Sequence, residues 1–157
     1  MSMRAPLLVA ATLALALPVT ARADDAAVAG NFTAKFEEGG TTCSPNPVTL
    51  ARGTVKVEVK KTSLTVNIEL IPEMVGVVQK GGKINAKTKR VVGTTVVGLS
   101  ARYSVAGRVE GDILSVVLVA EYIRQDTNKP YCEQSWNISG LREGAVDKTD
   151  KSKPKAK

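Results

Sequence analysis

Residue types that usually perform catalysis are scarce in this 157-residue chain. There is no histidine, the usual general base near neutral pH and the commonest metal ligand. No glycine-rich phosphate loop follows a predicted strand and opens a helix. Neighbouring carboxylates occur at Glu37-Glu38 and at Glu110 and Asp112, which we place in loops or turns, where solvated acids are common. The sequence therefore predicts a protein that is not an enzyme and needs no metal or cofactor.

The two cysteines, Cys43 and Cys132, are the remaining residues with covalent chemistry. They are far apart in the chain and lack the Cys-x-x-Cys spacing of a redox pair. In an exported chain the expected state is a disulfide, which excludes a thiol nucleophile and a zinc-thiolate site. A closed loop of about 90 residues contributes about 4–5 kcal/mol in the chain-entropy model. We expect a structural disulfide.

Residues 1–23 are typical of a secretory signal peptide. Arg4 supplies the positive start, residues 7–17 form an apolar centre, and Ala21-Arg22-Ala23 suits a signal peptidase. The apolar run is shorter than the roughly 20 residues that span a bilayer. We expect a mature chain that begins at Asp24, is periplasmic or secreted, and does not span the membrane. The alanine-rich leader favours a bacterial source.

The mature region contains several runs in which apolar and polar residues alternate with period two, the pattern of half-buried strands. The predicted strands are residues 31–37, 54–60, 63–70, 74–79, 91–97, 99–109, 113–123 and 131–139. In one predicted hairpin Val59 lies opposite Leu64. In another, Gly111-Asp112 forms the turn and Tyr103 lies opposite Ala120.

About eight strands with short links favour an all-β fold, an antiparallel meander closed as a small up-and-down barrel, because closure removes exposed sheet edges. A two-sheet β-sandwich is the alternative. A bond between the two cysteines would join the first and last strands, which are neighbours in a closed barrel. The domain is predicted to span residues 24–142. Residues 143–157 are rich in lysine, lack apolar periodicity and are predicted to be a disordered tail.

Four aromatic side chains are predicted to face the barrel interior and are candidates to line a ligand cavity. They are Phe32, Tyr103, Tyr122 and Trp136. The tripeptide Gly30-Asn31-Phe32 resembles the Gly-x-Trp sequence that opens the first strand of calycins, a group of small exported β-barrels, with phenylalanine in place of tryptophan. We carry over no residue role and no ligand from this resemblance.

A basic run lies in a predicted glycine-containing loop, residues 79–90. Its cationic side chains are Lys80, Lys83, Lys87, Lys89 and Arg90. They could contact an anionic envelope polymer or lipid headgroup. Alternatively, the lysines keep the rim of a sheet from aggregating. The loop has no aromatic residue on which a base could stack, so we expect no binding to nucleic acid.

The predicted strand 113–123 carries a second apolar row, Ile113, Val117 and Val119, on its outward face. Either another part of the chain covers this row or it is a contact surface for a homo-oligomer. The leading functional hypothesis is an exported, non-enzymatic binding module. Its ligand would be a small apolar molecule in the barrel or a cell-envelope partner at the rim. The alternatives are a protease-inhibitor-like protein that presents residues 24–30 and a structural or oligomeric envelope component.

Overall fold

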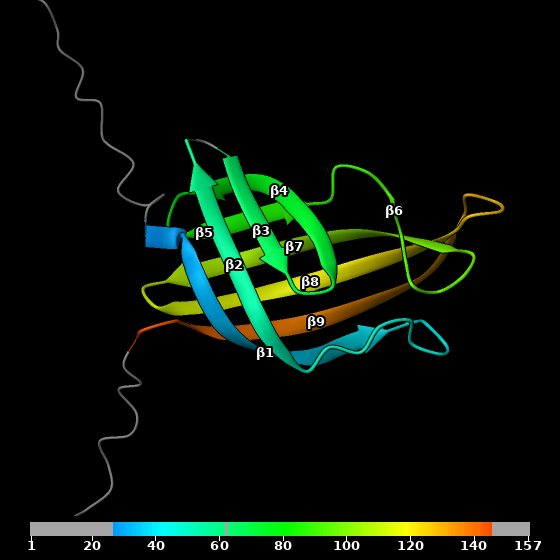
Figure 1. Ribbon diagram of the computed structural model, residues 1–157, viewed down its shortest axis with the longest axis horizontal. Coiled ribbons are helices and arrows are strands. Elements are labelled where there is room, and N and C mark those ends of the chain that lie inside the picture. The colour runs from blue at the N-terminus through cyan, green and yellow to red at the C-terminus, as the bar shows by residue number, and fades with distance from the viewer. Residues whose placement is uncertain (1–26, 62, 146–157) are drawn as a thin grey trace, which may run out of the picture.

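The computed structural model describes residues 27–61 and 63–145 (Figure 1). The predicted signal peptide, the expected start at Asp24 and residues 146–157 of the predicted tail lie outside the described residues. The described chain is all-β, as predicted. Its strands are β1 (Gly30–Thr41), β2 (Arg52–Lys60), β3 (Ser63–Ile68), β4 (Ile71–Gln79), β5 (Lys83–Lys87), β6 (Val92–Gly93), β7 (Leu99–Glu110), β8 (Ile113–Arg124) and β9 (Pro130–Arg142).

Eight of these strands form a closed antiparallel barrel. The sheet runs in the order β5-β4-β3-β2-β1-β9-β8-β7, and pairing between β5 and β7 closes the ring. The short β6 is an extra strand that pairs with β7. Apart from the pairs β1–β9 and β5–β7, strands that are neighbours in the ring are consecutive in the chain. The predicted up-and-down barrel is therefore confirmed in preference to the sandwich.

Both predicted hairpins have the expected register. Val59 pairs with Leu64 between β2 and β3, and Tyr103 pairs with Ala120 between β7 and β8. The β7–β8 turn contains Gly111 at a φ of 57°, in the left-handed region that glycine adopts without strain. Because side chains alternate along each strand, a correct register also assigns each residue to the correct face.

The interior of the barrel is a single hydrophobic cluster to which every strand of the ring contributes. Five large side chains in it have almost no exposed surface: Trp136, Tyr122, Phe32, Leu64 and Met74. They come from β9, β8, β1, β3 and β4, so large side chains enter the interior from five different strands of the ring. Side chains of this size packed together are what a solid core requires.

The basic segment at residues 79–90 was predicted to be a loop, and this expectation was wrong for its central part. Residues Lys83–Lys87 form β5, with Ile84 and Ala86 buried and the lysines exposed. The segment K-I-N-A-K does alternate, but its charges and the neighbouring glycines suggest a loop. Gly81 and Gly82, both with positive φ, in fact make the tight β4–β5 turn.

The predicted strand 91–97 was also largely wrong, since only Val92–Gly93 forms a strand. The hydroxyl oxygen of Thr94 lies 3.0 Å from the backbone oxygen of Leu99 and 3.1 Å from that of Val96, either of which can accept its single proton, and it accepts from the backbone N–H of Val96. These bonds fold the segment into a local turn, which is a common alternative to strand pairing for threonine.

Gly76 permits a close approach between β4 and β5. A Cβ atom at this position would lie 1.8 Å from the backbone oxygen of Asn85. The Gly76→Ala variant should therefore be destabilised by about 1–3 kcal/mol, as expected for overpacking against atoms that cannot move away. Urea unfolding measures the difference. Gly93→Ala is the matched control, because nothing lies within 4 Å of its added Cβ. Equal stability of the two variants would contradict the β4–β5 packing.

The strands differ in length, which makes the two ends of the barrel unlike each other. Strands β1, β7, β8 and β9 have 12 or 13 residues, whereas β2 to β5 have between 5 and 9. The long strands project past the short ones at the end that carries loops 42–51, 94–98 and 125–129 (Figure 1). We call this end the mouth. The opposite end carries the tight β2–β3, β4–β5 and β7–β8 turns.

Candidate functional site

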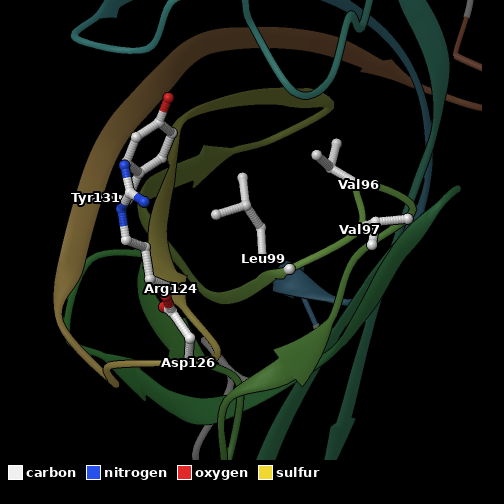
Figure 2. A pocket seen from close by; sticks show the side chains of 7 residues that line it. Val96, Val97, Leu99, Arg124, Asp126 and Tyr131 are labelled. Atoms are coloured by element: carbon white, nitrogen blue, oxygen red, sulfur yellow. The ribbon is translucent and has the colours of Figure 1, made fainter.

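A hollow of about 400 Å³ lies at the mouth (Figure 2). Apart from Gly98, its lining side chains are Val96, Val97, Leu99, Arg124, Asp126 and Tyr131. In Figure 2 the two valines stand across the hollow from Arg124 and Tyr131, with Leu99 between them. The hollow therefore has an apolar wall, an apolar floor and a polar, aromatic wall.

Two features of the sheet place the polar wall. Leu99 pairs with Arg124 between β7 and β8, so both side chains leave the same face of the sheet. Between β8 and β9 the register shifts, since Tyr122 pairs with Cys132 but Ile123 pairs with Pro130. This bulge leaves Tyr131 unpaired, and bulges commonly re-aim a side chain. The guanidinium carbon of Arg124 lies 4.7 Å from the centroid of the Tyr131 ring, a cation–π arrangement.

Hydrogen bonds join the two walls of the hollow. The side-chain nitrogen of Gln125 donates to the backbone oxygen of Leu99 and to the hydroxyl of Ser100, both at 3.1 Å. The backbone N–H of Gln125 donates to the oxygen of Gly98 at 2.9 Å. Loop 94–98 and turn 125–129 are thus held together, so the hollow is preformed.

The chemistry of the hollow suits binding. Val97 is 99 % exposed, and Leu70, in the turn between β3 and β4, is 84 % exposed. Arg124 and Asp126 have no ion-pair partner among the described residues. The planar guanidinium is suited to bidentate recognition of a carboxylate. Exposed aliphatic side chains beside an unpaired arginine and a tyrosine are typical of a recognition surface.

A chain of buried polar groups lies beneath the mouth. Gln134 is completely buried, and its amide nitrogen donates to the backbone oxygen of Val48 at 2.9 Å. Its amide oxygen lies 3.5 Å from the Tyr122 hydroxyl. Burial raises the pKa of Tyr103 and of Tyr122, and for Tyr122 the neighbouring Tyr103 raises the pKa further. Both hydroxyls therefore stay neutral at physiological pH.

The predicted disulfide between Cys43 and Cys132 is present, with an S–S distance of 2.08 Å and a Cα–Cα distance of 5.0 Å. It fastens the β1–β2 loop to the start of β9, and the backbone N–H of Thr42 adds a 2.8 Å bond to the oxygen of Glu133. A disulfide is compatible with an oxidising compartment outside the cytoplasm.

The four candidate ligand-lining residues all face the interior and belong to its single hydrophobic cluster, but they lie at different positions along the barrel. Tyr103 and Tyr122 lie close enough to each other on the mouth side to affect each other's pKa. Phe32 lies toward the opposite end, where the guanidinium of Arg142 sits 4.8 Å from its ring centroid. Trp136 is buried between these positions, opposite Leu118. A ligand-lining role for the four stays a prediction.

The other predicted surface residues lie on the outside of the barrel. Lys83 and Lys87 are exposed on β5, while Lys80 precedes the strand and Lys89 and Arg90 follow it. The apolar row on β8 also faces outward. Of its residues, Ile113 and Val117 are exposed and Val119 is half-buried.

Sequence reasoning missed the mouth hollow. The sequence held two local signals. One is the pair of apolar dipeptides, Val91-Val92 and Val96-Val97, on either side of Gly93-Thr94-Thr95; the other is the dipeptide Pro130-Tyr131 directly before Cys132. Neither signal shows that Tyr131 meets Arg124, because that contact depends on a bulge and on the register of β8 with β9.

The chain matches no family model, no curated protein and no solved structure. Within the described residues, no three histidine, cysteine, aspartate or glutamate side chains are grouped as a metal site. The described part of the chain also contains no helix with the length and apolarity needed to cross a membrane.

Proposed function

We propose that this protein is an exported, non-enzymatic binding module whose partner, another component of the cell envelope, docks at the mouth of the barrel. The observation that carries the proposal is the preformed hollow between Val97 and the stacked pair Arg124–Tyr131. A partner segment suited to it has an apolar side chain that packs on Leu99 and a carboxylate that accepts hydrogen bonds from Arg124.

The packing of the barrel supports a site at the mouth over a site in the interior. The largest side chains of the core have almost no exposed surface, and Trp136 is only 1 % exposed. Three other described hollows, each of about 330–410 Å³, lie along the outer faces of β7, β8, β9 and β1. A small apolar ligand inside the barrel is the second candidate. It predicts a retained ligand in the native mass spectrum of protein purified from its own host.

Site-specific photo-crosslinking in the host tests the proposal and captures a partner of any identity. A benzophenone amino acid placed at Val97 should yield a discrete adduct on irradiation. The same amino acid at Thr65, on the outer face of β3, is the matched control and should yield no such adduct.

Introducing Arg124→Glu beside the Val97 probe should weaken the adduct at least tenfold, because a carboxylate partner would then face a like charge. The mass of the adduct separates the alternatives, since a protease or a second copy of this chain would each be identified directly. Identical adducts from Val97 and Thr65, or none from Val97, would contradict a partner at the mouth.

A further inference from the structure

We propose that the outer face of β4, β5 and β7 binds the anionic surface of a phospholipid bilayer. This surface is distinct from the mouth and does not depend on the function proposed there. The residues that would make the electrostatic contact form the basic strip: Lys80, Lys83, Lys87, Lys89 and Arg90.

The strip runs along β5 and continues past both ends of this five-residue strand. Lys83 and Lys87 point outward from the strand, four residues apart and therefore on the same face. Lys80 extends the strip at the turn-bearing end, and Lys89 and Arg90 extend it toward the mouth. Lys83 and Lys87 lie on a strand, so these two charges are held at a fixed spacing.

No residue of the strip takes part in an ion pair within the described part of the molecule. The ion pairs there are Lys35–Glu37, Lys56–Glu58, Arg102–Glu121, Arg108–Glu110 and Arg142–Asp112. None of them includes a residue of the strip. The paired lysines lie on β1 and β2, whereas those of β5 are left for an external anion.

Two cationic residues face each other across the pairing of β5 with β7. In the closing pair of the barrel, Lys83 lies directly opposite Arg108. Like charges opposite each other on antiparallel strands are destabilising. Arg108 is already paired with Glu110 at 2.5 Å, so Lys83 is the cation of this pair that has no ion-pair partner among the described residues.

Exposed apolar side chains beside the strip favour a lipid surface over a soluble polyanion. Val77 on β4 is 49 % exposed. A lateral row runs from it across the sheet through consecutive strand pairs: Val77 with Asn85, Asn85 with Ala106, and Ala106 with Val117. This lateral row of four residues carries no charge. Basic residues with interleaved aliphatic side chains fit a headgroup layer, where both contribute to binding.

Vesicle sedimentation of the full exported chain tests the proposal. The protein should bind vesicles of equal parts phosphatidylglycerol and phosphatidylcholine and should not bind pure phosphatidylcholine. Each basic residue near an anionic membrane strengthens binding about fivefold. Lys83→Glu with Lys87→Glu should therefore reduce the affinity by at least twentyfold.

The matched control is Lys35→Glu with Lys56→Glu, on β1 and β2, which changes the net charge equally and leaves any contribution of the lysine-rich C-terminus unaltered. It should retain binding within about threefold, since long-range charge effects are screened in salt. Thermal unfolding verifies that both double variants are folded.

Val77→Ser separates the lipid surface from a soluble polyanion. This variant should bind the anionic vesicles about threefold more weakly and dextran sulfate with unchanged affinity. Equal losses in the two double variants would overturn the proposal. So would binding of dextran sulfate without binding of vesicles, which would point to an anionic polymer instead.

Discussion

Replacing both Cys43 and Cys132 with alanine should lower the free energy of unfolding by about 4–5 kcal/mol. The two residues are 89 positions apart, so their bond removes much of the chain entropy of the unfolded state. The loss is comparable to the whole stability of a marginal domain. Urea unfolding at neutral pH measures it, with the fluorescence of Trp136 as the signal.

A reductant provides the control for this experiment. It should destabilise the wild-type protein by a similar amount and leave the double variant unchanged. Loops 42–51 and 125–129 should also become more susceptible to proteolysis in the double variant, because the bond joins the β1–β2 loop to β9. A loss below about 1 kcal/mol would mean that the disulfide does not constrain this fold.

Trp136→Ala should cost about 3–5 kcal/mol, the range for truncating a large aromatic side chain in a packed core. Trp136 lies on β9 between its paired residues, Leu118 of β8 and Glu38 of β1. Its indole ring is 1 % exposed, so few neighbouring atoms can move into the space that truncation leaves. Urea unfolding followed by circular dichroism measures the change, since the variant has no tryptophan.

Tyr131→Ala is the matched control, because Tyr131 is an exposed aromatic residue of the same strand. Its truncation should change stability by no more than about 0.5 kcal/mol. The comparison also distinguishes the two candidate functions. A side chain that lines an empty ligand cavity has fewer contacts to lose, so a small effect of Trp136→Ala would favour a ligand in the interior.

Both hairpins were predictable because local and long-range signals agreed. Around Gly111 the flanking strands alternate over a full twelve residues each, and the register follows directly from the turn. The closing pair β1–β9 was indicated only indirectly, through the expected disulfide. Alternation identifies which face of a strand is buried, but it does not identify the neighbouring strand.

The errors were concentrated at β5 and β6, where composition and structure disagree. Ile84 and Ala86 are two small contributions to the core, and the surrounding charges obscured their alternation. In contrast, the apolar segment that contains Val96 and Val97 resembles a strand but is turned by the side chain of Thr94. These valines lie at the mouth, so the local pattern failed at the candidate site.

The arrangement of the mouth depends on contacts between distant parts of the chain. Arg124 and Tyr131 meet only because β8 and β9 are paired with a bulge, and Gln125 joins the mouth loops through Leu99. A single sequence contains no direct record of such contacts. The basic strip, by comparison, was visible in the sequence, but its position on a rigid strand was not.

The binding that we propose at the mouth and at the basic strip depends in both cases on a closed ring of strands. Nuclear Overhauser contacts between β1 and β9 and between β5 and β7 test this claim most directly. We predict cross-strand contacts between Phe36 and Ile138 and between Ala86 and Val105. If either set is missing while the contacts of the β7–β8 hairpin are present, the sheet is open and the account is contradicted.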